Sequence, residues 1–138
     1  MKRTVADLMT TELLHVEPQS TALAALQRME EGGVRHLLVL EEGELRGIIS
    51  NRDIVRVNLS NAGRVLDLEG CSAAQIMTPA PLSTTTPKAS LPEVAGRMHR
   101  EKIDALPVLD EGRLVGILSS DDVLRAVSEM EVPCSAKP

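Results

Sequence analysis

The chain alternates between short apolar runs, which predict strands, and stretches with apolar residues three and four positions apart, which predict helices. The strand candidates cover residues 13–17, 36–40 and 45–50, and then 82–86, 105–109 and 114–119. In each set the last two strands are joined by a glycine-containing segment typical of a hairpin turn, at 41–44 or 110–113. One helix is predicted before each hairpin and another after it. The order of elements is therefore β-α-β-β-α, twice.

Capping residues set the predicted limits of the two helices that precede the hairpins. Ser20 is expected to cap the first, Gly32-Gly33 is expected to end it, and its apolar face would hold Ala22, Leu23, Leu26 and Met29. In the second copy Ser90 and Glu93 form a Ser-x-x-Glu capping box, and Pro92 is tolerated in the first turn.

The two halves of the sequence align without a gap at an offset of 69 positions, from Pro18 on Pro87 to Arg56 on Arg125. The same residue also recurs at Arg28 and Arg97, Met29 and Met98, Gly43 and Gly112, Gly47 and Gly116, Ser50 and Ser119, and Asp53 and Asp122. Upstream, Leu-Met-Thr at 8–10 matches Ile-Met-Thr at 76–78 once one residue is inserted. The chain is therefore an internal duplication.

The duplication predicts one repeat over 5–58 and a second over 75–128. Between them a linker covers 59–74, with a short helix expected in its later part, and a frayed tail covers 129–138. A piece of about 60 residues buries only about 60% of its unfolded surface and is marginally stable alone. We therefore expect the two copies to pack on each other.

Composition narrows the classes of function. The net charge is −5 and Phe, Trp and Tyr are all absent, so both the basic surface and the stacking platforms of nucleic-acid binders are missing. No run of 18 apolar residues could span a membrane, and the first residues lack the apolar core of a signal peptide. Cys71 and Cys134 stand apart and are expected to be free thiols. These features predict a cytoplasmic protein that binds neither nucleic acid nor membrane.

The pattern Gly-apolar-apolar-Ser-x-x-Asp is kept in both copies, at residues 47–53 and 116–122. One interpretation is a capping box at the start of a helix, in which the Ser oxygen accepts a backbone N–H. The other is a ligand site, because a hydroxyl and helix N–H groups suit a phosphate and a nearby carboxylate suits the paired hydroxyls of a ribose. The glycine would let either a ligand or another stretch of backbone approach closely.

These residues resemble a tandem pair of CBS domains, a Bateman module, over about residues 5–128. The resemblance rests on Met-Thr at 9–10 and 77–78, on Val-Arg-His-Leu-Leu-Val and Ile-Asp-Ala-Leu-Pro-Val, and on the repeated Gly-to-Asp pattern. It implies an α/β fold of the α+β type, with two β-α-β-β-α repeats packed with pseudo-twofold symmetry. It also implies clefts that bind AMP, ADP, ATP or S-adenosylmethionine, a homodimer, and a regulatory role in which ligand binding rearranges the module and signals to an effector protein.

The resemblance assigns a role to particular residues. Asp53 and Asp122 would hold ribose hydroxyls, and Ser50 and Ser119 would face phosphate. The purine slot would be lined by Val34, Leu38, Ile103 and Pro107, its edge read by backbone around His36 and Ala105, and its rim formed by Thr10 and Thr78. Leu38 departs from the family, which often has proline at this position, as at Pro107.

The two copies differ in charge around the repeated pattern. The first copy has Arg35, His36 and Arg52 where the second has Asp104, Ala105 and Asp121. Guanidinium groups bind phosphate and carboxylates repel it, so the first site is predicted to prefer phosphorylated ligands and the second to be weaker or to prefer a less anionic adenosine. The simpler interpretation is that these charges are only solvated. A magnesium ion could accompany a bound polyphosphate.

An enzymatic function is not favoured by the sequence. The three histidines, His15, His36 and His99, are scattered without the spacing of a zinc site, and no nucleophile and base are paired. The stronger alternative is a degenerate module that serves only for dimerisation or partner docking. Such a module would not need to keep both serines and both aspartates, which this chain does.

Overall fold

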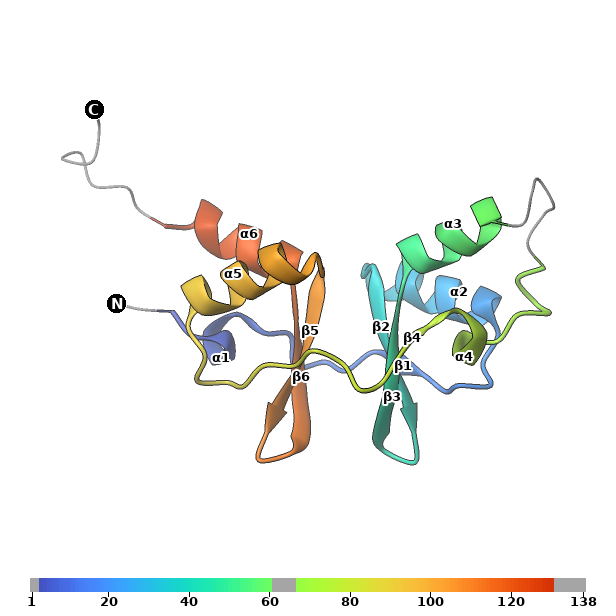
Figure 1. Ribbon diagram of the computed structural model, residues 1–138, viewed down its shortest axis with the longest axis horizontal. Helices are drawn as coiled ribbons and strands as arrows, with labels where there is room; N and C mark the ends of the chain where they lie inside the picture. The colour runs from blue at the N-terminus through green and yellow to red at the C-terminus, as the bar shows by residue number, and fades with distance from the viewer. Residues whose placement is uncertain (1–2, 61–66, 131–138) are drawn as a thin grey trace. The chain divides into compact units, whose positions relative to one another are not determined.

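The computed structural model describes residues 3–60 and 67–130, and the chain divides into two compact units (Figure 1). The continuous unit holds residues 12–83, and the discontinuous unit holds residues 1–11 together with 84–138. The predicted linker and tail fall partly at 61–66 and 131–138, outside the described residues, as does Cys134. The short helix expected late in the linker is present as α4 (Ala73–Ile76).

The continuous unit is a four-stranded sheet with helices. It contains β1 (His15–Val16), α2 (Ala22–Gly32), β2 (His36–Glu41), β3 (Glu44–Ser50), α3 (Asn51–Ser60), α4 and β4 (Thr78–Pro79). The strand order is β1-β2-β3-β4, in which β1 is parallel to β2 and the other neighbours are antiparallel. The predicted strands 13–17, 36–40 and 45–50 are confirmed, the first as a shorter element.

The discontinuous unit repeats this plan. It contains α1 (Val5–Leu8), α5 (Leu91–Glu101), β5 (Ala105–Asp110), β6 (Arg113–Ser119) and α6 (Ser120–Ser128). Beside the antiparallel β5–β6 hairpin, single bridges join Thr85 to Val108 in parallel and Thr10 to Ile117 in antiparallel fashion. These bridges take the places that β1 and β4 hold in the continuous unit. The strand predicted over 82–86 is therefore wrong in extent, because only Thr85 pairs with a strand.

The two Met-Thr segments are exchanged between the repeats. Thr10, at the start of the first repeat, pairs with β6 of the second, whereas Thr78 pairs with Ile48 in β3 of the first. Each compact unit therefore combines one repeat's helices and hairpin with the other repeat's Met-Thr segment. The repeat boundaries proposed from the sequence do not coincide with these units and stay a prediction.

The helix caps correct one expectation and confirm others. Thr21 caps α2 by accepting a hydrogen bond from the Ala24 N–H (3.0 Å), and Ser20 instead accepts one from the Glu17 N–H (3.2 Å). Ser20 was the wrong choice because its hydroxyl closes the turn around Pro18. Gly33 ends α2 in the left-handed region, as predicted.

The second copy and the turns follow the sequence more closely. Ser90 caps α5 by accepting from the Glu93 N–H, with Pro92 in the first turn, but the return bond from the Ser90 N–H to the Glu93 side chain is not formed, so only half of the predicted capping box is present. Both central residues of each hairpin turn have positive φ, namely Glu42 (51°) with Gly43 (80°) and Glu111 (50°) with Gly112 (80°). Positive φ at both positions is typical of a type I′ turn, whose twist matches the flanking strands.

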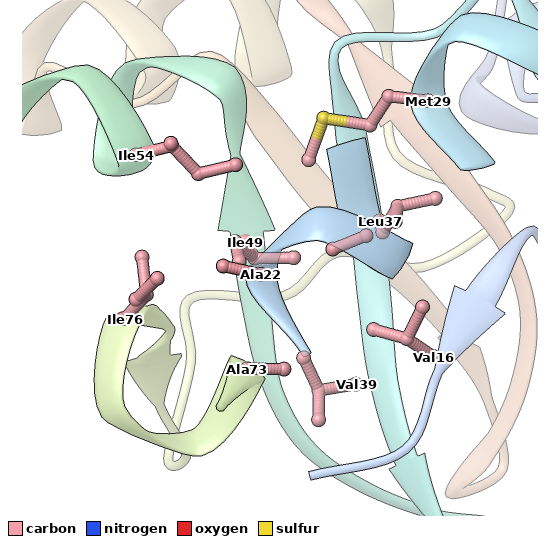
Figure 2. Packing of buried hydrophobic residues seen from close by; sticks show 10 residues of the cluster. Val16, Ala22, Met29, Leu37, Val39, Ile49, Ile54, Ala73 and Ile76 are labelled. Atoms are coloured by element: carbon pink, nitrogen blue, oxygen red, sulfur yellow. The ribbon is translucent and has the colours of Figure 1, made fainter. Parts of the chain in front are cut away.

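Each unit has its own apolar core. Figure 2 shows the core of the continuous unit, where side chains from the sheet meet those of α2, α3 and α4; it comprises Val16, Ala22, Ala25, Met29, Leu37, Val39, Ile49, Ile54, Ala73 and Ile76. Ala25 is buried in it, whereas the predicted Leu26 is only partly buried. The core of the discontinuous unit comprises Val5, Leu8, Leu91, Val94, Met98, Leu106, Val108, Leu118, Val123 and Ala126. The helices cover one face of each sheet (Figure 1).

Candidate functional site

The repeated Ser-x-x-Asp pattern forms the junction between a strand and the following helix in both units. Ser50 ends β3, its N–H donates to Asp53 Oδ2 (2.8 Å), and its Oγ accepts from the Asp53 N–H (3.1 Å). In the second copy the Ser119 N–H donates to Asp122 Oδ2 (2.9 Å), and Ser119 Oγ accepts from the Asp122 N–H (3.2 Å). The capping-box interpretation is therefore confirmed at both places.

The register of each hairpin brings the other predicted residues beside this junction. His36 pairs with Ser50, and the Asn51 N–H donates to the Arg35 carbonyl oxygen (3.0 Å). We call the group of Arg35, His36, Ser50, Arg52 and Asp53 the first corner.

The second copy has the same arrangement. Ala105 pairs with Ser119, and the Ser120 N–H donates to the Asp104 carbonyl oxygen (2.7 Å). We call the group of Asp104, Ala105, Ser119, Asp121 and Asp122 the second corner. In each unit, residues about 15 positions apart along the chain thus meet at one end of the hairpin, opposite the turn.

Each corner carboxylate also contacts an arginine one helical turn further on. Asp53 Oδ1 lies 3.8 Å from Arg56, and Asp122 Oδ1 lies 3.2 Å from Arg125. The Asp53 side chain is 14% exposed and the Asp122 side chain 7%. Oδ2 is therefore engaged by the cap, and a ligand hydroxyl would share Oδ1 with the guanidinium group. Sequence reasoning missed these arginines, although Asp-x-x-Arg is a spacing at which helix side chains meet.

The glycine three residues before each serine gives room to the exchanged Met-Thr segment. A Cβ atom on Gly47 would lie 2.6 Å from both the Met77 sulfur and the Thr78 carbonyl oxygen. The corresponding atom on Gly116 would lie 2.7 Å from the Met9 sulfur and 3.1 Å from the Thr10 carbonyl oxygen. Of the two expectations for this glycine, close approach of backbone is the one that the structure shows.

Thr10 and Thr78 lie at matching places, each in the unit that holds the other repeat's corner. Thr78 pairs with Ile48, two residues before Ser50, and Thr10 pairs with Ile117, two residues before Ser119. Both residues are exposed. Each therefore lies on the strand next to the one that leads into a corner, and its role at the rim of a site stays a prediction.

The four predicted purine-slot residues do not share one environment. Leu38 and Pro107 are fully buried, and by strand alternation they lie on the sheet face opposite the core residues on either side of them. Val34 and Ile103 are half-buried and pack against the cores of their own units. Their role in a purine slot stays a prediction.

The described residues contain neither a cluster that could bind a metal ion nor a helix that could span a membrane. In residues 3–60 and 67–130, no group of three or more His, Cys, Asp or Glu residues is placed to hold a metal ion. Within the same ranges, no helix combines the length and the apolarity needed to cross a membrane.

Known proteins resemble this chain in both of its repeats. The family model of the CBS domain matches the chain twice, over residues 5–60 and 73–129. The chain belongs to the CBS-domain family. The CBS domain-containing protein YhcV of Bacillus subtilis is 31% identical over 126 residues, which cover 91% of this chain and 85% of YhcV.

Two solved CBS structures carry adenosine compounds. The CBS domain pair of protein MJ0100, in complex with 5′-methylthioadenosine and S-adenosyl-L-methionine, is 25% identical, with a TM-score of 0.77 over 93% of this chain and 98% of that chain. CBSX2 in complex with AMP is 29% identical, with a TM-score of 0.74 over 92% of this chain and 97% of that chain. Several other curated relatives are longer, and the matched part of this chain spans between 15% and 46% of their length.

Proposed function

We propose that this CBS pair is a regulatory module that binds an adenosine-containing ligand, AMP, ADP, ATP or S-adenosylmethionine, at its two corners. The observation that carries the proposal is the repeated corner, in which a serine hydroxyl, a carboxylate and a helix amino terminus are held together twice by the same hydrogen bonds. The similarity to CBS pairs solved with AMP and with S-adenosyl-L-methionine supports the choice of ligand class.

We propose a part in ligand binding for each group of a corner. The ribose hydroxyls would donate to Oδ1 of Asp53 or Asp122, the oxygen that the cap leaves available. The serine hydroxyl already accepts an N–H, and its own hydrogen could be donated to a phosphate oxygen. The positive end of the α3 or α6 macrodipole would add to phosphate binding. Because the chain has no aromatic residue, the purine would pack against aliphatic side chains.

Regulation follows from linkage between binding and conformation. A ligand shifts an equilibrium only by the difference in its affinity for the two states. We propose that the output is a change in conformation or in dimer arrangement that an effector protein recognises. Helix α6 and the residues just after it offer a surface for the proposed dimer, because Leu124 (65% exposed), Val127 and Met130 are large apolar side chains left exposed there.

The first test is to identify any compound that copurifies with the protein. The protein lacks Trp, Tyr and Phe and is nearly transparent in the near ultraviolet, so a bound purine would dominate the absorption. After denaturation and filtration, the filtrate would be measured by absorption and mass spectrometry. A stoichiometric adenosine compound supports the proposal. An empty filtrate, followed by no heat of binding with AMP, ATP or S-adenosylmethionine, would favour the docking-only module.

A second test separates ligand binding from capping. Asp53→Asn and Asp122→Asn keep an oxygen that can accept the serine N–H, but they remove the negative charge that a ribose hydroxyl would meet. A hydrogen bond to a charged group is worth about 1.5–3 kcal/mol, so affinity at the altered corner should fall about 10- to 160-fold. Glu44→Gln, on an exposed residue at the turn end, is the control. Unchanged affinity in both corner variants would argue against a ribose site.

A further inference from the structure

The two corners have the same backbone and opposite charge. Arg35 precedes β2, and its carbonyl oxygen accepts a hydrogen bond from the N–H of the first residue of α3. Asp104 precedes β5, and its carbonyl oxygen accepts the corresponding bond from the first residue of α6. The second helical residue is Arg52 in α3 and Asp121 in α6. Arg35, Arg52 and Asp121 are exposed, and Asp104 is half-buried. The charges therefore occupy equivalent places on equivalent backbones.

Several groups are present in both corners and therefore cannot make one corner prefer a different ligand from the other. Both have a serine cap, a helix amino terminus and an Asp–Arg pair at the next turn. With these groups included, the first corner holds three arginines and one aspartate, Asp53, for a formal charge of +2 with His36 neutral. The second corner holds three aspartates and one arginine, Arg125, for a formal charge of −2. The difference in charge between the corners arises because Arg35 and Arg52 of the first correspond to Asp104 and Asp121 of the second.

This difference has a chemical consequence for adenosine compounds. A guanidinium group binds phosphate through charge-assisted hydrogen bonds, whereas carboxylates repel phosphate and attract a cation. AMP and S-adenosylmethionine share the nucleoside but differ at the 5′ carbon, where one carries a phosphate and the other a positively charged sulfonium. The side chains around a corner would act on that part of the ligand, because the nucleoside is common to both.

We infer that the two corners divide adenosine compounds by charge, the first taking an adenosine phosphate and the second an adenosine sulfonium. The inference rests on the proposed function and adds which ligand each corner takes. It also assigns Arg35 and Asp121 as specificity-determining residues. A module of this kind would respond to two ligands at once, with one site for each.

Amide resonances can locate each ligand without altering the protein. AMP, S-adenosylmethionine and uncharged adenosine would be titrated into ¹⁵N-labelled protein while the amides of 50–53 and 119–122 are followed. We expect AMP to shift the first set at lower concentration than the second, S-adenosylmethionine to do the reverse, and adenosine to show a smaller preference. If both charged ligands select the same corner, the inference fails and the proposed function stands. If no adenosine compound shifts either set, both fail.

Charge reversal at equivalent positions tests the assigned residues. Arg35→Asp and Asp121→Arg each introduce the kind of charge that the other repeat carries at that place, so we expect both variants to fold. Arg113→Glu and Glu44→Arg are matched controls, because these two exposed residues also correspond between repeats, give the same change in net charge, and lie at the turn ends.

The variants have opposite expected effects. At low ionic strength Asp121→Arg should raise AMP affinity and lower S-adenosylmethionine affinity at the second corner, each by about tenfold. Arg35→Asp should lower AMP affinity at the first corner by a similar factor, and both effects should shrink as salt is added. Far-ultraviolet circular dichroism would confirm that each variant is folded. Changes no larger than those of the turn-end controls would overturn the inference.

Discussion

The Thr85 hydroxyl gives the sharpest prediction about stability. Thr85 is 4% exposed, and its Oγ1 is buried with no hydrogen-bond partner among the described residues. Its backbone bridges Val108 in parallel, as Val16 does with Val39 in the other unit. The duplication thus supplies its own comparison, because the equivalent position holds a valine inside an apolar core. We predict that Thr85→Val stabilises the protein.

The size of the expected stabilisation follows from the burial of the Thr85 hydroxyl without a hydrogen-bond partner among the described residues. Burying a hydroxyl without a hydrogen bond costs about 1–3 kcal/mol in protein mutational data, and valine has nearly the shape of threonine. The free energy of unfolding should therefore rise by about 1–3 kcal/mol. For a protein of this size each kcal/mol corresponds to roughly 2–4 °C in melting temperature. The reverse change in the other unit, Val16→Thr, should lower stability by a similar amount.

The assay is urea unfolding followed by far-ultraviolet circular dichroism, because the chain has no Trp or Tyr to report by fluorescence. The matched control is Thr86→Val, the same substitution at an exposed neighbour, which should change stability by no more than about 0.5 kcal/mol. If Thr85→Val were no more stable than Thr86→Val, the reasoning would be refuted, and a buried water bonded to Oγ1 would be the first alternative to examine.

Three further predictions concern other parts of the chain. Gly47→Ala should destabilise more than Gly116→Ala in the same unfolding assay, because its Cβ would lie 2.6 Å from a backbone oxygen and that of Gly116 would lie 3.1 Å from one. Equal losses would contradict this difference, and no loss at either position would contradict the role given to the Met-Thr segments. Lys102→Gly should stabilise by about 1 kcal/mol, since Lys102 ends α5 with φ 57° where the other repeat has Gly33, and a loss of stability would count against it. If α6 forms the interface of the proposed dimer, Leu124→Glu should shift sedimentation toward the monomer, and an unchanged profile would remove α6 from that interface.

Much of the fold could be predicted because its signals are local. The hairpin turns were visible as Glu-Gly between apolar runs, and both Ser-x-x-Asp junctions were visible as capping boxes. Such signals depend on residues a few positions apart, whose contacts are set by the helix or strand itself. The misplaced cap at Ser20 marks the limit of this approach, since Ser20 and Thr21 are both good capping residues. Only the path of the chain around Pro18 chooses between them.

The sequence was enough to predict which residues lie together at each corner, but it said less about what surrounds them, and a ligand site at these residues stays a prediction. The hairpin register that joins Arg35 and His36 to Ser50 follows from the turn, so the sequence was enough to group them. The burial of Leu38 and the packing of Val34 against the core depend on which sheet face each side chain takes and on what covers it. Those facts come from segments distant in sequence, which patterning within one segment does not specify.

The duplication, the order of the main elements in each repeat and the capped corners can be read from the sequence, because each is encoded by neighbouring residues and is present twice. The exchange of the Met-Thr segments, by which Thr10 pairs with the second repeat's hairpin and Thr78 with the first's, depends on contacts between distant parts of the chain. The two segments, Leu-Met-Thr and Ile-Met-Thr, are nearly identical in sequence, so they carry no local signal of which hairpin each one joins. The choice is made by long-range pairing and by the path of the connecting chain, neither of which leaves a local signature.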